Sequence, residues 1–197
     1  MACLNGYIDV VKLLISHNAD MKARDKEGSN VLHLLCWGNR FDTLQHLLTN
    51  HGDALKEQKN EKDFNGNTPL GVACLNGHID VVKLLISHNA DMKARNKEGS
   101  NILQLACSEE HWNLFQHFLT NHGAAFSEQI DQRAPFKFTL LEITCSRGET
   151  KIAELLLSCG ANIYTTFPNT EDFSINLEST GWNASIIELL MKKHQQG

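Results

Sequence analysis

The stretch CLNGHIDVVKLLISHNADMKAR, residues 74–95, decides the fold because the chain contains it twice. The copy, CLNGYIDVVKLLISHNADMKAR, occupies residues 3–24 and differs only at Tyr7, which stands in place of His78. A catalytic site has to be made once, whereas a structural unit or an extended surface is made by copying. The duplication therefore predicts a repeated architecture.

The repeat has two levels. The copies lie 71 positions apart, and they continue less closely as DKEGSNVLHLLC (25–36) and NKEGSNILQLAC (96–107). At about half that distance, residues 66–91 align with residues 137–162. The equivalent positions are separated by 38, 33, 38 and 33 residues, and they are Gly28, Gly66, Gly99, Lys137 and Thr170. A period near 33 residues is typical of stacked repeats.

The unit at residues 66–94 illustrates the expected local structure. TPL opens a short helix that ends at Gly77, and a second helix, IDVVKLLISH, follows. Its apolar residues recur at helical spacing, and Asn89 suits the left-handed conformation at a helix end. An extended excursion then turns back at Gly99. Two short helices cannot bury their apolar faces alone, so stacked neighbours supply the core.

This unit resembles the ankyrin repeat, whose signature includes G-x-T-P-L-H-x-A-A, then G-H-x-x-V-V-x-L-L-L and G-A-D. The matching residues are Gly66, Thr68, Pro69, Leu70, Ala73, Gly77, His78, Val81, Val82, Leu84, Leu85, Ala90 and Asp91. The resemblance implies an all-α helical solenoid of stacked helix-turn-helix repeats with projecting β-hairpin-like loops. TPLH itself is intact nowhere in the chain.

The resemblance covers the whole chain as a single ankyrin-repeat domain. The expected divisions are a half repeat at 1–27, repeats at 28–65, 66–98, 99–136 and 137–169, and a degenerate terminal repeat at 170–197. Met1 falls inside a unit, so we expect a segment of a longer array. We place the five extra residues of each 38-residue unit as one between the helices and four in the excursion.

The charge and hydrophobicity of the chain limit the classes of partner and the cellular location that the sequence predicts. The formal charge of −5 lacks the basic excess typical of nucleic-acid binding, and no apolar run approaches the roughly 20 residues that span a bilayer. The N-terminus lacks a secretory signal pattern. We therefore expect no nucleic-acid partner, no direct membrane insertion and a cytoplasmic location, with the nucleus as an alternative.

Cysteine recurs at one position of the repeat, at Cys3, Cys36, Cys74, Cys107 and Cys145. Stacked layers lie roughly 10 Å apart, whereas a disulfide requires Cα atoms about 4.4–6.8 Å apart. These thiols are therefore predicted to be free, buried side chains in a reducing compartment.

Histidine recurs just after the second helices, at His17, His51, His88 and His122. Their spacing argues against a shared metal. A histidine there can interact with the helix C-terminus, and contact with a partner is the alternative. The resemblance implies that His33 bonds to backbone between repeats. No catalytic motif is present, so we predict no enzyme activity, no cofactor and no metal.

The resemblance implies a concave binding face made of the loop tips and the exposed side of the first helices. The tip positions are Lys26, Glu27, Ser29, Phe64, Asn65, Asn67, Lys97, Glu98, Ser100, Phe136 and Phe138. The first-helix positions are Trp37, Leu75, Asn76, Ser108, Glu109, Ser146 and Arg147. The charged tips are alternatively solvated turns. The phenylalanines are either binding anchors or pack under their own excursions.

The expected function is a protein–protein interaction scaffold. The alternative is a regulatory cytoplasmic ankyrin domain of a larger protein, such as an ion channel or an enzyme. The expected partner is another protein, whose identity the sequence does not specify. We expect a monomer unless the N-terminal face self-associates.

Overall fold

The structure of the protein is a computed structural model that describes residues 2–133, 138–166 and 181–195. Every regular element within these ranges is a helix and none is a strand. The prediction of an all-α repeat solenoid is therefore confirmed. The structure forms two compact units, Met1–Leu114 and Phe115–Gly197.

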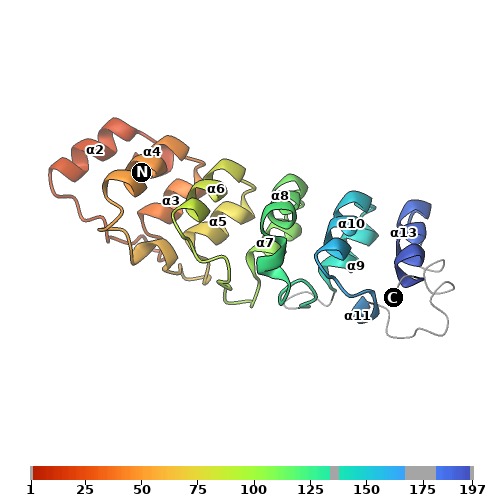
Figure 1. Ribbon diagram of the computed structural model, residues 1–197. Helices are drawn as coiled ribbons and strands as arrows, with labels where there is room; N and C mark the ends of the chain where they lie inside the picture. Colours follow the sequence, from red (N-terminus) through yellow and green to blue (C-terminus); the bar gives the residue numbers. More distant parts are fainter. Residues whose placement is uncertain (1, 134–137, 167–180, 196–197) are drawn as a thin grey trace. The chain divides into compact units, whose positions relative to one another are not determined.

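The first unit alternates two kinds of helix. The first helices of its repeats are α1 (Ala2–Asn5), α3 (Val31–Trp37), α5 (Pro69–Leu75) and α7 (Ile102–Ser108). The second helices are α2 (Ile8–Ser16), α4 (Phe41–Asn50) and α6 (Ile79–Ser87), and α8 (Trp112–His122) begins in this unit. Figure 1 shows α2, α4 and α6 in one row, with α3 and α5 in a row beneath them.

The second unit continues the alternation. After the 3₁₀ turn η2 (Gly123–Phe126) come α9 (Leu140–Ser146), α10 (Thr150–Ser158), α11 (Ile163–Thr166) and α13 (Ala184–His194). Helix α10 packs against both α9 and α13. The buried Phe118 and Phe126 rings meet edge to face, with centroids 5.6 Å apart.

Side-chain caps fix where the first helices begin. The Asn101 side chain accepts a hydrogen bond from the backbone N–H of Gln104 at 2.9 Å, and the Gln104 side chain accepts one from the N–H of Asn101 at 3.0 Å. Such a capping box satisfies two N–H groups that the helix cannot pair. Equivalent boxes open α3 and α9, whereas Thr68 followed by Pro69 opens α5.

The core lies between neighbouring helices. Helix α5 packs between α3 and α7, and its buried side chains include Leu70, Ala73 and Cys74. The predicted apolar stripe of α6 consists of Ile79, Val82, Leu85 and Ile86. Val82 and Leu85 are fully buried, and Ile79 and Ile86 are half-buried. Asn89, just beyond α6, has a φ of 59°, which confirms the predicted left-handed end of this helix.

The extra residue of the long units was misplaced by the sequence alignment. Three residues separate α3 from α4, and three also separate α5 from α6. The added residue instead lengthens the second helix, because α4 has 10 residues and α6 has 9. Asn39, with φ of 54°, makes the left-handed turn that Gly77 makes in the shorter unit. Asparagine tolerates this conformation, so Asn39 takes the place of Gly77 and no residue is added between the helices.

The longer excursion of the 28–65 unit has its own structure. It contains the 3₁₀ turn η1 (Gln58–Asn60), and both Leu55 and Gln58 in this excursion are buried. The additional residues therefore build a packed segment beside the first helices rather than a projecting tip.

Candidate protein-interaction surface

Three finger turns follow one another in the first unit, at residues 25–29, 63–67 and 96–100. Each begins with Asp or Asn, whose side-chain oxygen accepts two backbone hydrogen bonds. Asp25, for example, accepts from the N–H groups of Glu27 at 3.0 Å and Ser29 at 2.8 Å. Asp63 and Asn96 make the same pair of bonds in their own turns. The side chain thereby replaces the pairing that a longer hairpin would provide.

Backbone bonds join the finger turns into a row. The N–H of Phe64 donates to the carbonyl of Glu27, and the N–H of Lys97 donates to the carbonyl of Asn65, both at 2.9 Å. Each turn is thus attached to its predecessor, so the side chains that the row presents sit on a connected backbone.

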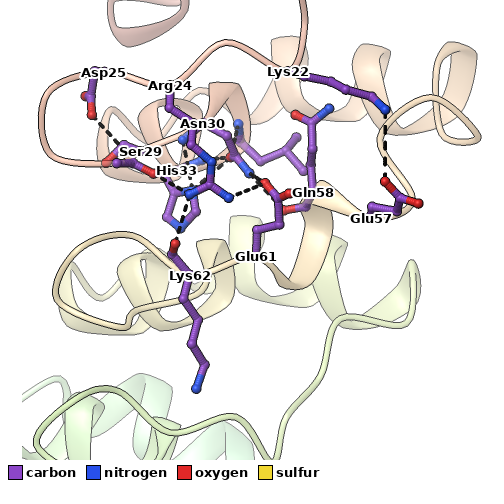
Figure 2. Close-up of polar contacts among 12 residues, drawn as sticks. Lys22, Arg24, Asp25, Ser29, Asn30, His33, Glu57, Gln58, Glu61 and Lys62 are labelled. Atoms are coloured by element: carbon purple, nitrogen blue, oxygen red, sulfur yellow. Dashed lines mark hydrogen bonds and ion pairs between the residues drawn. The ribbon is translucent and has the colours of Figure 1, made fainter.

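Figure 2 shows how Arg24 fastens the base of the first finger turn to the next repeat. Its guanidinium donates to the carbonyl oxygens of Gly28 at 2.8 Å and Lys62 at 3.0 Å. It also pairs with the Glu61 carboxylate at 2.7 Å. Arg24 therefore has a positioning role within the surface.

His33 makes the inter-repeat bond that the family resemblance implied. Its Nε2–H donates to the backbone carbonyl of Asn67 at 2.9 Å, and its Nδ1 accepts from the N–H of Asn30 at 3.2 Å (Figure 2 labels His33 and Asn30). Burial lowers the pKa of His33 below its ordinary value, since desolvation disfavours the imidazolium. The ring is therefore a neutral structural bridge.

Most of the predicted binding positions are exposed. Those with exposed side chains are Lys26, Glu27, Trp37, Phe64, Asn65, Asn76, Lys97, Glu98, Glu109, Phe138, Ser146 and Arg147. Ser29 and Leu75 are half-buried. Phe136 and the side chain of Ser108 lie outside the described part of the chain.

Two predicted binding positions are buried, and their expected exposure was wrong. Asn67 and Ser100 each close a finger turn and lead into the next first helix. The carbonyl of Asn67 accepts from His33, and the carbonyl of Ser100 accepts from the N–H of Asn96 at 3.1 Å. Both residues stabilise the base of the fingers and present no side chain to a partner.

Phe64 is exposed and packed at the same time. Its side chain is 62% exposed, yet a Cβ atom added to Gly28 would lie 2.6 Å from the ring. The ring therefore lies over the neighbouring finger turn. One face of Phe64 therefore packs on the preceding finger turn, and a binding role for its exposed face stays a prediction.

Trp37 is the large exposed side chain at the end of α3, and it is 56% exposed. Its backbone carbonyl accepts a hydrogen bond from Nε2 of His78 at 3.2 Å. The same bond recurs between His111 and the Leu75 carbonyl at 2.9 Å, and Arg40 donates to the Leu4 carbonyl at 2.8 Å. A basic residue just before α4, α6 and α8 was the signal for this row, and sequence reasoning missed it.

In the second unit, Phe138 borders a small pocket. The pocket has a volume of about 220 Å³ and is lined by Phe138, Glu142, Ile143, Ser146 and Trp182. The Glu142 carboxylate also pairs with Arg133 at 3.4 Å. This part of the surface therefore offers an apolar hollow beside a neutralised carboxylate.

The cysteines behave as packing groups. All six are free, and Cys36, Cys74, Cys107 and Cys145 are buried, whereas Cys3 and Cys159 are half-buried. Burial raises the pKa of Cys145 to about 12 and raises that of Cys74 well above its ordinary value. Such thiols carry too little thiolate near neutral pH to act as nucleophiles.

The predicted histidine row meets the helix ends as expected at two of its positions. Nδ1 of His88 lies 3.0 Å from the Leu84 carbonyl, and Nδ1 of His17 lies 2.9 Å from the Leu13 carbonyl. Within residues 2–133, 138–166 and 181–195, no three potential ligands are grouped to hold a metal ion. In those same ranges no helix has the length and apolar character needed to span a membrane.

Sequence comparison now identifies the family. The family described as "Ankyrin repeats (3 copies)" matches residues 1–96 and 38–131. The matched region exceeds half of the chain, so the protein belongs to the ankyrin-repeat family. Members of this family are generally non-enzymatic and act by binding other proteins.

The similar proteins are diverse and much longer. Tyrosine-protein kinase HTK16 of Hydra vulgaris is 36% identical over 120 residues, which are 60% of this chain and 15% of the kinase. An ankyrin repeat and KH domain-containing protein of Caenorhabditis briggsae is 35% identical over 181 residues, 91% of this chain and 6% of that protein. Alpha-latrocrustotoxin-Lt1a of Latrodectus tredecimguttatus is 30% identical over 127 residues, 64% of this chain and 8% of the toxin. The chain spans 15% or less of each of these relatives.

Proposed function

We propose that the chain binds a partner protein through the finger turns and the exposed ends of its first helices. In residues 1–114 the proposed contacts are Lys26, Glu27, Trp37, Phe64, Asn65, Asn76, Lys97, Glu98 and Glu109. In residues 115–197 they are Phe138, Ser146 and Arg147.

The observation that carries this proposal is the pair of exposed aromatic rings on a connected backbone. Phe64 lies over the preceding finger turn and Trp37 ends a packed helix, so neither residue requires a flexible loop to be ordered on binding. Pre-positioned side chains lose little conformational entropy in a complex. Aromatic residues at the centre of an interface often dominate its affinity.

The charged residues of the finger turns would lie at the edge of such an interface. Lys26 and Glu27 pair with each other at 3.6 Å and are largely exposed. Exposed pairs of this kind contribute little to stability, so they are available to set orientation and association rate for a partner. The aromatic residues would supply affinity, and the mixed charges would limit the choice of partner.

Alanine substitution tests the proposal. A partner captured from cell lysate by the intact chain would be identified, produced separately and titrated against variants. Phe64→Ala and Trp37→Ala should each weaken binding by roughly 1–3 kcal/mol. Lys83→Ala on α6 is the matched control, because Lys83 is exposed and pairs with Asp80 on its own helix.

The circular dichroism spectrum of each variant must match that of the parent for the comparison to hold. If Lys83→Ala abolishes binding while Phe64→Ala and Trp37→Ala have no effect, the partner binds the second helices and the proposed surface is wrong.

A second candidate function is that of a regulatory segment within a larger protein. The observation that favours it is the small share of each relative that the chain covers, which is 15% of a tyrosine-protein kinase and 6% of a KH domain-containing protein. The full reading frame tests it. A transmembrane or catalytic region in the same frame would support this candidate, and a frame that encodes these 197 residues alone would exclude it.

A further inference from the structure

The hollow beside Phe138 combines two aromatic rings with a carboxylate. It has a volume of about 220 Å³, and its lining residues all belong to the second unit: Phe138, Glu142, Ile143, Ser146 and Trp182. Phe138 directly precedes Thr139, the residue that caps α9, whereas Trp182 lies two positions before α13. Rings from two separate parts of the chain therefore border one small cavity.

This combination of residues occurs in one of the four complete repeats. The residues equivalent to Phe138 in the preceding units are Ser29, Asn67 and Ser100, and those equivalent to Glu142 are His33, Gly71 and Gln104. Gln104 completes the capping box of α7 without a charge, as Glu142 does in α9 with one. The helix cap alone therefore explains neither the carboxylate at position 142 nor the ring at position 138.

The Glu142 carboxylate makes its contacts through one of its two oxygens. Oε2 accepts from the N–H of Thr139 in the capping box, and it lies 3.4 Å from Nη1 of Arg133. Oε1 has no hydrogen bond or ion pair with any residue that the structure describes. The Glu142 side chain is 16% exposed, so a cation at Oε1 would be screened by solvent less than at an open surface.

The remaining groups of the hollow also favour a cation that carries hydrogen-bond donors. Oγ of Ser146 donates its proton to the Ile143 carbonyl at 2.8 Å, so the lone pairs of this oxygen are what it can offer to a ligand. The faces of Phe and Trp rings attract cations through their quadrupoles. The second unit has nine acidic and six basic residues, and this excess charge attracts a cation from a distance.

We propose that the hollow binds a lysine side chain of the partner protein. The inference rests on the proposed function, since Phe138 and Ser146 belong to the proposed surface. The methylene stem contacts the two rings and Ile143, and the ammonium donates to Oε1 of Glu142 and Oγ of Ser146. Arg133 holds the other oxygen of the carboxylate, so each cation is closer to the carboxylate than to the other cation and both attractions exceed the repulsion.

The same geometry favours lysine over arginine. A guanidinium pairs best with both oxygens of a carboxylate, and Oε2 of Glu142 is already engaged by Thr139 and Arg133. The compact ammonium of lysine requires one oxygen.

The test uses the N-acetyl methylamides of lysine, norleucine and arginine. Each is titrated into the whole chain at low ionic strength, while NMR follows the indole N–H of Trp182 and the amides of α9. Norleucine has the stem of lysine without the ammonium. We expect the lysine derivative to bind about fivefold more tightly than the norleucine derivative, and also more tightly than the arginine derivative. The advantage over norleucine should shrink at high salt, because salt screens the charges.

Three variants show whether the hollow is responsible. Glu142→Gln should abolish the advantage of lysine over norleucine while keeping the capping box, as Gln104 does in α7. Phe138→Leu should weaken binding of lysine more than binding of norleucine, because it removes a ring and keeps an apolar side chain. Glu149→Gln is the matched control, since it removes an equal charge outside the hollow. The amide spectrum of each variant shows whether it is folded.

Any of three results would overturn the inference. They are equal or tighter binding of norleucine or arginine to the parent chain, an unchanged lysine advantage in Glu142→Gln, and an equal loss of that advantage in Glu149→Gln. The probes require no partner protein, so their failure leaves the binding tests at Phe64 and Trp37 unaffected. Failure of those tests likewise leaves the titrations unaffected.

Discussion

Helices α2 and α6 have the same nine residues, IDVVKLLIS, and very different surroundings. Leu13 is 59% exposed and its equivalent Leu84 is 8% exposed, while Leu14 is 46% exposed and Leu85 is fully buried. The local structure is the same in both. Each helix is followed by a histidine bonded to a carbonyl four residues earlier and by an asparagine with φ of 59°. Identical residues therefore give identical helices, and neighbouring repeats decide what is buried.

The largest expected effect on stability is at the equivalent leucines, Leu85 and Leu14. Leu85→Ala removes a fully buried side chain, so it should lower the free energy of unfolding by about 2–5 kcal/mol. Leu14→Ala, at the equivalent position of the first copy, should cost about 1 kcal/mol because nearly half of its side chain is already exposed to solvent. Urea denaturation of both variants measures the difference. Equal losses would mean that α2 is covered in solution.

At the equivalent positions Cys74 and Cys3, the expected difference in lost stability is smaller. Cys74 is fully buried and Cys3 is half-buried at the equivalent position. Cys74→Ser should cost about 1–3 kcal/mol if its hydroxyl finds no partner, and Cys3→Ser should cost less. Native thiol labelling provides a second measurement, in which Cys3 and Cys159 should react before Cys74. Rapid labelling of Cys74 in the folded protein would contradict the assigned burial.

The equivalent residues His33 and Gln104 extend the comparison to the pH dependence of folding stability. They stand 71 positions apart, and both complete a capping box. Burial lowers the folded-state pKa of His33 from 6.5, so the unfolded chain binds the proton more readily. The contribution of His33 to stability is therefore present above pH 6.5 and is lost as the pH falls toward the folded-state pKa.

The matched variant is His33→Gln, which copies the residue found at position 104. Its stability at neutral pH should fall by about 1 kcal/mol or less, since glutamine can also complete the box. Between neutral pH and mild acid it should lose less stability than the parent. Thermal unfolding across this pH range measures the effect, and identical pH profiles would exclude His33 as their source.

The smallest expected effect is that of Tyr7→His, which makes residues 3–24 identical to residues 74–95. Stability should change by about 0.5 kcal/mol or less, because Tyr7 is exposed. Hydrogen exchange should still be faster in α2 than in α6. If the substitution gave α2 the protection of α6, the one differing residue, rather than the neighbouring repeat, would explain the contrast.

Sequence patterns predicted the helices, the free and mostly buried cysteines, and the left-handed turn at Asn89. They did so because these features depend on residues a few positions apart or on a repeated position. They failed at Asn39, which performs the role of glycine, and at Asn67 and Ser100, which are buried although they border exposed turns. These details depend on backbone conformation and on contacts with the next repeat.

By itself the sequence determined the repeat, the family and the helix boundaries to within a residue or two, because capping, turn formation and apolar periodicity are local properties. Only the tertiary structure decided that Phe64 lies over Gly28, that Lys59, Asn60 and Lys62 complete the following short repeat, and that the same leucines are buried in α6 and exposed in α2. The physical reason is that burial and hydrogen-bond partners are properties of two repeats in contact, and a copied stretch of sequence encodes only one side of that contact.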